Sequence, residues 1–233
     1  MVRVSATGAR LEADAVRDDG DVWTAADDRL ATGAGRLARA PLKRLLDFFG
    51  ALIGILLLSP FLLLVALVIV IESRGNPVFT QRRSGYRGAP FVIYKFRSMT
   101  VRDDGDTIVQ AARDDVRITR FGRLMRRTSI DELPQLFNVL AGNMSLCGPR
   151  PHALAHDEYY GALIDGYAAR FHAKPGITGL AQVCGLRGQT ETIDDMAARV
   201  EKDLEYIRNW TLVSDIKILV RTVFTFLFQP AAY

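Results

Sequence analysis

A run of 24 residues without a charged side chain, from Phe48 to Ile71, constrains this 233-residue chain more than any other feature. At a rise of ~1.5 Å per residue a helix of that length reaches about 36 Å, enough to cross a hydrocarbon core of about 30 Å. Ser59-Pro60 lies at the midpoint of the run. Proline removes a helix hydrogen bond, so a break there would leave two halves of about 16–18 Å, each able to enter one leaflet only. The run therefore predicts either a kinked single span or a re-entrant helix–break–helix.

Both flanks of this run are basic. The cations are Arg36, Arg39, Lys43 and Arg44 before it and Arg74, Arg82, Arg83 and Arg87 after it. Because basic residues favour the cytoplasmic side of a membrane, neither flank is the better candidate for translocation. A re-entrant segment satisfies both flanks, and the Ser59 hydroxyl is a candidate partner for the backbone groups freed at Pro60.

The composition adds weaker constraints. Lys and Arg number 30 against 26 Asp and Glu, a formal net charge of +4. This mild excess suits anionic lipid or a phosphate-rich substrate and is too small to indicate nucleic acid. The two cysteines, Cys147 and Cys184, lack the spacing of a metal site or a disulfide framework, which indicates a reducing compartment. Residues 1–40 are rich in Ala, Arg, Asp and Gly, so we expect them to be disordered or loosely helical, without a signal peptide.

Residues 76–99 have the pattern of a β-hairpin, with an extended VFTQRR, a glycine-rich turn and a strand-like FVIYKFRSM. Lys95 and Arg97 alternate with aromatic residues in the second strand, so both are expected to project from one face. Two cations on a strand commonly form a solvated face, and the pattern alone assigns them no role.

Two adjacent carboxylates, Asp131 and Glu132, follow the basic pair Arg126-Arg127. Chemistry on a phosphate needs such a set, because one carboxylate can attack phosphorus, the other can hold Mg²⁺, and cations can absorb charge on the phosphoryl oxygens. The alternative is that the two acids only cap a helix.

The helix expected after these acids has apolar residues at helical spacing, namely Leu133, Leu136, Phe137 and Leu140. Its start has two interpretations. Ser129 with Glu132 fits a capping box. With Asp131 as the N-cap, Pro134 falls in the first turn, where its missing N–H is tolerated. Either start places the acids at the positive end of the helix dipole, which favours an ionised Asp131 and attracts phosphate.

Two turn-rich motifs come next. GPRP at 148–151 is a rigid turn that presents Arg150 for bidentate contact with a phosphate. KPGITG at 174–179 contains glycines that let backbone N–H groups approach an anion, while Lys174 and Arg187 supply charge.

Two amphipathic helices are expected near the C-terminus. The first has Asp203 close to an apolar stripe made of Met196, Val200, Leu204 and Ile207. The second, residues 212–228, is strongly apolar and carries its polar residues on one face: Ser214, Lys217, Arg221 and Thr225. Such a helix would lie in the membrane interface, and a buried core helix is the alternative.

Several of these motifs resemble, in the same order, those of the bacterial sugar transferases, the monotopic phosphoglycosyl transferases. The similar segments are KFRSM at 95–99, DELPQLFNVLAGNMSLCGPRP at 131–151 and KPGITG at 174–179. The resemblance runs from about Pro41 to the C-terminus and implies an α+β, mostly helical fold. Residues 41–73 would form a re-entrant membrane anchor broken at Ser59-Pro60, after a disordered N-terminus at 1–40. Residues 74–233 would form the catalytic domain, with a short β-hairpin and interfacial amphipathic helices, on the cytoplasmic face of a bacterial inner membrane.

The resemblance also implies the chemistry. Asp131 would attack the sugar-bearing phosphate of a UDP-sugar and release UMP, leaving a covalent aspartyl-phosphosugar. Undecaprenyl phosphate would then accept the hexose 1-phosphate, which initiates exopolysaccharide or other glycoconjugate assembly. Glu132 would bind Mg²⁺, and the substrate and phosphate ligands would be Lys95, Arg97, Arg126, Arg150, Lys174, Arg187 and Asp203. GPRPHALAH at 148–156 and GLRGQTET at 185–192 are similar to the versions in glucose-1-phosphate transferases, which favours glucose over galactose.

Two other classes of protein remain as alternatives. A membrane-anchored scaffold without catalysis would make Asp131 replaceable. A nucleic-acid-binding module would need clustered cations with stacking aromatics, and the apolar run argues against it. The sequence does not fix the sugar, the polyprenyl length, the pathway or the oligomeric state, and a homodimer is one of the states it allows.

Overall fold

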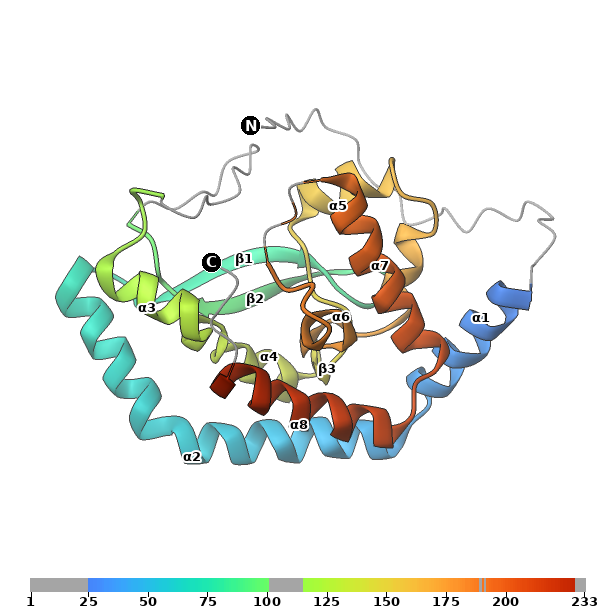
Figure 1. Cartoon of the computed structure of the whole chain (residues 1–233). Helices are drawn as coiled ribbons and strands as arrows, with labels where there is room; N and C mark the ends of the chain where they lie inside the picture. Colours follow the sequence, from blue (N-terminus) through green and yellow to red (C-terminus); the bar gives the residue numbers. More distant parts are fainter. Residues whose placement is uncertain (1–24, 101–114, 189, 191, 229–233) are drawn as a thin grey trace.

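The computed structural model describes residues 25–100, 115–188, 190 and 192–228, which are mostly helical with two small two-stranded sheets (Figure 1). The helices are α1 (Ala25–Ala38), α2 (Pro41–Ser73), α3 (Arg120–Thr128), α4 (Gln135–Ala141), α5 (Leu154–Gly161), α6 (Leu180–Val183), α7 (Ile193–Arg208) and α8 (Leu212–Phe228). The strands are β1 (Val78–Ser84), β2 (Pro90–Phe96), β3 (Ser145–Cys147) and β4 (Gly176–Thr178). Three 3₁₀ helices complete the set: η1 (Tyr86–Gly88), η2 (Ile130–Glu132) and η3 (Tyr167–His172).

α2 is a helix of 33 residues that contains the whole apolar run and Pro60. Figure 1 shows that it bends partway along its length. The nitrogen of Pro60 cannot donate to the carbonyl of Leu56, and the Ser59 hydroxyl donates to that carbonyl instead, at 2.9 Å. The expected break is therefore a bend in a continuous helix, because a side chain replaces the lost backbone hydrogen bond. Within the described residues, α2 is the one helix long and apolar enough to cross a membrane.

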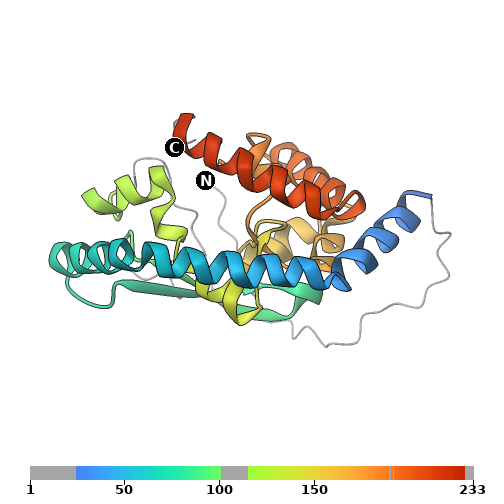
Figure 2. The ribbon, with the colours of Figure 1, turned by 90° about the horizontal axis from the view of Figure 1, so that it is seen from below.

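Both ends of α2 are bonded to the same folded body, along which the helix extends (Figure 2). Near its start, the ammonium of Lys43 donates to the Asp215 carboxylate of α8 at 2.7 Å and to the carbonyl of Cys147 in β3 at 3.1 Å. At its end, the guanidinium of Arg97, just after β2, donates to the carbonyl of Ser73 at 3.1 Å. The folded body therefore holds the two ends of the apolar helix at once.

β1 and β2 form the predicted antiparallel hairpin, in which Val78 lies opposite Phe96. The side chain of Asn138 in α4 completes the free edge of β2. It accepts a hydrogen bond from the Tyr94 N–H at 2.9 Å and donates one to the carbonyl of Val92 at 2.6 Å. This contact fixes α4, and with it the segment that carries the two acids, beside β2.

β3 and β4 form a short parallel pair that the sequence did not predict, with Ser145 opposite Gly176. The chains approach so closely that a Cβ at Gly176 would lie 2.1 Å from the backbone nitrogen of Gly148. Only glycine fits there. The pairing brings the two turn-rich motifs, 148–151 and 174–179, side by side.

The segment around the acids differs from both predicted helix starts. Ser129 follows α3 in a left-handed conformation, with φ at 51°. The two acids lie in η2, and α4 begins only at Gln135, directly after Pro134. Ser129 makes no capping hydrogen bond with its side chain, and Asp131 is not the residue that precedes α4. Both the capping box and the Asp131 N-cap are wrong, because Pro134, with its φ already near the helical value, starts the helix by itself.

Residues 25–38, expected to be disordered or loosely helical, form the helix α1, which packs on α7. Leu37 is buried in this contact. A Cβ at Gly33 would lie 2.2 Å from the carbonyl oxygen of Ile207, so glycine lets the two helices approach closely. The composition did not predict this helix, because its contact with α7 depends on small residues that allow close packing and not on large apolar side chains. Residues 1–24 lie outside the described residues.

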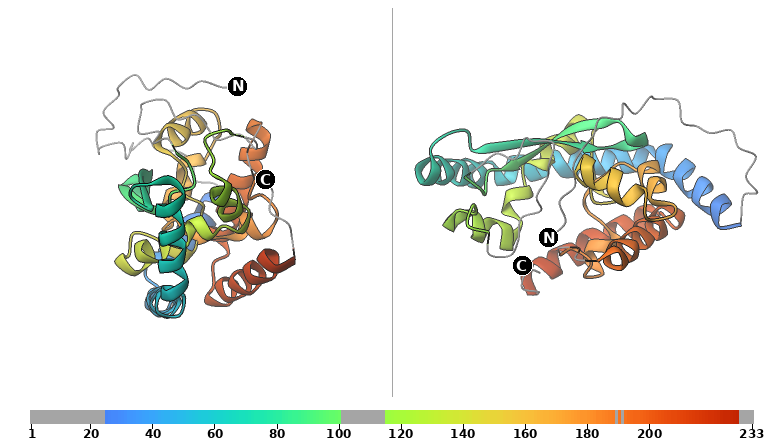
Figure 3. Two further views of the ribbon diagram at one scale, coloured as in Figure 1. Left: turned by 90° about the vertical axis from the view of Figure 1, so that its left-hand side faces the viewer. Right: turned by 90° about the horizontal axis from the view of Figure 1, so that it is seen from above.

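α8 lies beside α2 on one face of the molecule (Figures 1 and 3). It is amphipathic, as predicted, and is not a buried core helix. Asp215 and Ile218 face the interior. The exposed apolar side chains of α8 are Val213, Ile216, Val220, Val223 and Phe224, and those near the start of α2 are Leu42, Leu45, Phe49 and Ile53. Both helices therefore expose apolar side chains.

Candidate active site

Three distant segments meet at the carboxylate of Glu132. Lys95 of β2 donates to its Oε1 at 2.9 Å. Arg150, in the turn after β3, donates through Nη2 to Oε1 at 2.7 Å and through Nη1 to Oε2 at 3.0 Å. Glu132 is only 8% exposed, so these cations replace water around its charge. Two of the predicted phosphate ligands, Lys95 and Arg150, are thus brought to the predicted acid pair.

The two acids differ in ionisation. Burial opposes the charge on Glu132, but Arg150 and Lys95 outweigh it and hold the pKa of that carboxyl well below its usual range. Burial and the neighbouring Glu132 raise the pKa of Asp131 to about 6, although Lys95, Arg126 and Arg150 act in the opposite direction. One acid is therefore fixed as an anion, and the other gains or loses its proton close to neutral pH.

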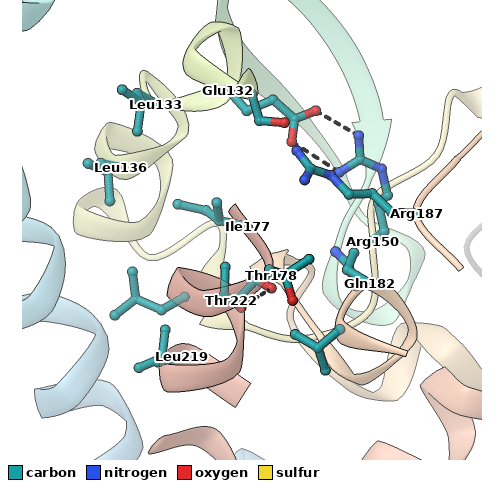
Figure 4. A pocket seen from close by; sticks show the side chains of 14 residues that line it. Glu132, Leu133, Leu136, Arg150, Ile177, Thr178, Gln182, Arg187, Leu219 and Thr222 are labelled. Carbon is teal, nitrogen blue, oxygen red and sulfur yellow. Dashed lines mark hydrogen bonds and ion pairs between the residues drawn. The ribbon is translucent and has the colours of Figure 1, made fainter. Parts of the chain in front are cut away.

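A cavity of about 170 Å³ opens beside this cluster (Figure 4). Glu132, Arg150 and Arg187 line its charged end, so Arg187 also joins the predicted set. The neutral polar residues in the wall are Ser129, Thr178, Gln182, Thr222 and Thr225. Apolar side chains form the rest, namely Leu133 just after η2, Leu136 of α4, Leu146 of β3, Ile177 of β4, Val183 of α6 and Leu219 of α8. Asp131 is partly exposed and does not line this cavity.

Three predicted ligands lie elsewhere. Arg97 donates to the carbonyl and hydroxyl of Ser73 at the end of α2. Lys174 lies toward the start of α2, where burial and Arg44 lower the pKa of its ammonium. Asp203 is buried in α7. Arg97 ties the end of the hairpin to the end of α2, and none of the three side chains lines the cavity.

Asp203 acts through a residue that the sequence did not single out. Arg170 of η3 is 3% exposed and donates through Nε to the Asp203 carboxylate at 2.8 Å. Its Nη2 donates to the carbonyl of Arg150 at 2.7 Å. The pair therefore supports the turn that presents Arg150 to Glu132. The position of Asp203 beside an apolar stripe predicts that its carboxylate is buried and needs a cation. Nothing in the sequence identified Arg170 as that cation.

The acid pair is the candidate metal site. Among the residues that the structure describes, no group of three or more His, Cys, Asp and Glu side chains is placed to hold a metal. Mg²⁺ needs no such cage, because it commonly binds one or two carboxylates together with substrate phosphates and water. Oε1 of Glu132 accepts two hydrogen bonds and Oε2 only one, which leaves a lone pair on Oε2. The carboxylates of Asp131 and Glu132 would therefore be the oxygen ligands that hold Mg²⁺, which would supply positive charge to a substrate phosphate.

The site combines an ionised acid, a second acid with a pKa of about 6 and several cations, and it lies next to an apolar helix of membrane length. This combination is typical of a membrane-associated transferase that acts on phosphate groups. Comparison with known proteins makes this specific. The chain belongs to the bacterial sugar transferase family, whose sequence model matches residues 15–229.

Named relatives are similar over most of this chain. The UDP-glucose:undecaprenyl-phosphate glucose-1-phosphate transferase of Caulobacter vibrioides is 55% identical over 191 residues, which is 82% of this chain and 72% of the relative. Proteins of the same name from Klebsiella pneumoniae and Escherichia coli K12 are each 48% identical, over 82% and 88% of this chain. These matches cover 41% and 44% of those two relatives, so the chain spans less than half of their length.

Proposed function

We propose that this chain transfers glucose 1-phosphate from UDP-glucose to undecaprenyl phosphate and releases UMP. The observation that carries this proposal is the pair Asp131-Glu132, set among Lys95, Arg126 and Arg150 beside a cavity with largely apolar walls. The cations suit a diphosphate, and apolar walls next to α8 suit a lipid-linked acceptor. The names of the similar proteins supply the sugar and the lipid.

In the proposed reaction, a carboxylate oxygen of Asp131 attacks the sugar-bearing phosphorus of UDP-glucose. The bond from that phosphorus to the bridging oxygen breaks, and UMP leaves with the electron pair. An oxygen of undecaprenyl phosphate then attacks the same phosphorus and frees Asp131, which gives a polyprenyl-diphospho-glucose. Lys95, Arg126 and Arg150 stabilise the charge on the phosphoryl oxygens in both steps.

Glu132 supports this nucleophile in two ways. Its fixed negative charge raises the pKa of Asp131, which makes the Asp131 carboxylate a stronger base. Its free Oε2 lone pair, with Asp131, would hold Mg²⁺, and a bound Mg²⁺ would neutralise phosphate charge.

We also propose that α2 is re-entrant, with the folded body at the cytoplasmic face of the inner membrane. A spanning helix would place its two ends on opposite sides of the bilayer. The contacts of Lys43 with Asp215 and of Arg97 with Ser73 support the placement of both ends on one side. Cysteines placed at Arg39 and Arg82, in a chain lacking Cys147 and Cys184, should react alike with an impermeant thiol reagent in intact cells. Opposite accessibility would establish a span.

The chemistry is tested by incubating the purified chain with UDP-sugars, Mg²⁺ and undecaprenyl phosphate while UMP is recorded. UDP-glucose should give the fastest release, and a mass increase on the intact protein should reveal the phosphosugar adduct. Asp131→Asn should abolish both signals, whereas the exposed Asp165→Asn should change neither. Release at least tenfold faster from UDP-galactose would change the sugar but keep the reaction. An undiminished adduct in Asp131→Asn would place the nucleophile elsewhere, and no UMP release from any sugar would favour a scaffold.

A further inference from the structure

Gln182 presents an amide at the cavity that has no partner. The residue is 6% exposed, and within the described part of the chain neither Nε2 nor Oε1 has a hydrogen-bond partner. Its side chain lines the cavity next to Arg150 and Arg187 (Figure 4). A buried polar group left without a hydrogen bond is unfavourable in a folded protein and needs an explanation.

The neighbouring residues show that this amide is held in place. Gly179 lies against it, and a Cβ there would be 2.7 Å from Oε1 of Gln182. The nearby hydroxyls are already engaged, since Thr178 and Thr222 are hydrogen-bonded to each other at 2.7 Å and Thr222 also donates to the carbonyl of Ile218 at 2.7 Å. The fold therefore leaves the Nε2 donor group and the Oε1 acceptor of Gln182 available at a fixed place in the cavity wall.

We infer that Gln182 is a binding residue for the donor substrate, in which its amide hydrogen-bonds hydroxyl groups of the hexose. This inference rests on the proposed function. A vicinal pair of hydroxyls offers one acceptor and one donor side by side, which matches a single amide.

The other parts of the two substrates fit this position less well. The polyprenyl chain has no groups that form hydrogen bonds, and the phosphates have the cations Arg150 and Arg187. A uracil ring would be expected to stack on an aromatic side chain, and the described residues that line the cavity include none. In the proposed reaction the sugar phosphate also stays on the enzyme through both steps, whereas uridine leaves after the first. The enclosed position of Gln182 therefore suits the hexose, which stays on the enzyme through both steps.

A substrate role and a structural role have opposite effects on the free protein. Gln182→Met keeps nearly the same volume and removes both polar atoms. If the Gln182 amide is unpaired until a ligand binds, the melting temperature of the ligand-free variant should equal that of the parent or be about 3 °C higher, because an unsatisfied buried group has been removed. Asn138 is the matched control, since both polar atoms of its buried amide are bonded to β2. Asn138→Leu should therefore lower the melting temperature.

Binding is measured by calorimetry on the full chain in nanodiscs, in an Asp131→Asn background that prevents turnover. Gln182→Met should raise the Kd for UDP-glucose about 10-fold and leave the Kd for UDP unchanged. Equal weakening of UDP and UDP-glucose would overturn the hexose assignment, since the contact would then be to uridine or phosphate. A lower melting temperature with both Kd values unchanged would overturn any ligand role.

Two safeguards keep this test decisive. Gln182→Leu repeats it with a branched apolar side chain, should the methionine variant fail to fold. Failure of the proposed function would look different, as an absence of UMP release from every UDP-sugar by the unaltered chain, while the ligand-free melting comparison would still report on the amide.

Discussion

Asp131→Asn should make the protein more stable at neutral pH while removing its activity. Burial and the charge of Glu132 raise the pKa of Asp131 from 3.8 to about 6. Above pH 6 the folded chain therefore contains a carboxylate that would be better solvated in the unfolded chain. Asparagine keeps the shape of the side chain and carries no charge.

The magnitude and the pH window follow from linkage. Because the folded pKa is the higher one, stability is fully present below about pH 4 and is lost as the pH rises through about 6. A change from 3.8 to about 6 sets an upper limit of about 3 kcal/mol. Asp131 is partly exposed, so solvent screening reduces the expected gain of the variant to about 1–2 kcal/mol, or roughly 3–6 °C in Tm.

Thermal unfolding in one detergent, followed by tryptophan fluorescence from pH 4 to pH 8, tests this expectation. The difference in Tm between Asp131→Asn and the parent should be near zero at pH 4 and reach its plateau above pH 6. The exposed control Asp165→Asn should show no such pH-dependent gain. A variant that is less stable than the parent at pH 7.5 would refute the reasoning, because it would mean that the nearby cations more than compensate the buried charge.

Two further outcomes concern this site, and a third concerns the buried ion pair between α2 and α8. Formation of the phosphosugar adduct should fall about tenfold per pH unit below pH 6 as Asp131 becomes protonated, measured by quenched-flow mass spectrometry; a flat profile would exclude Asp131 as the titrating nucleophile. Glu132→Gln should slow UMP release about 100-fold and weaken its dependence on Mg²⁺, and an unchanged Mg²⁺ titration would show that Glu132 acts only by orienting Arg150. Lys43→Met should lower the free energy of unfolding by about 3–5 kcal/mol in urea titrations, because it leaves Asp215 buried without its cation. Adding Asp215→Asn should recover part of that loss, and no recovery would contradict the ion-pair explanation.

The sequence was most informative where one local pattern decides the structure. Alternation predicted the hairpin, helical spacing predicted α7 and α8, and Ser59-Pro60 located the bend of α2. The acid pair and Arg150 could be assigned to one site because a phosphate requires complementary charges and their motifs lie close in the chain.

The sequence was less informative where a side chain depends on a distant partner. Arg97 follows Lys95 by two residues, yet β2 ends at Phe96, and the Arg97 guanidinium reaches the end of α2. No local pattern reveals where α2 ends in space. Asp203 likewise depends on Arg170, which lies 33 residues away and in a different element.

The bond between Lys43 and Asp215 has a consequence for the order of events during synthesis. The two residues are 172 positions apart, so at ~5–20 residues per second the ribosome completes Asp215 roughly 10–35 s after Lys43. Throughout that interval α2 exists without the contact that fixes its start to α8. Its contacts with earlier residues can form before then, since Arg44 donates to the carbonyls of Val139 and Leu140 and Ser145 donates to Asp47. The contact with α8 is thus the last of these bonds that can form, and it closes the start of α2 onto a body whose α4 and β3 are already made.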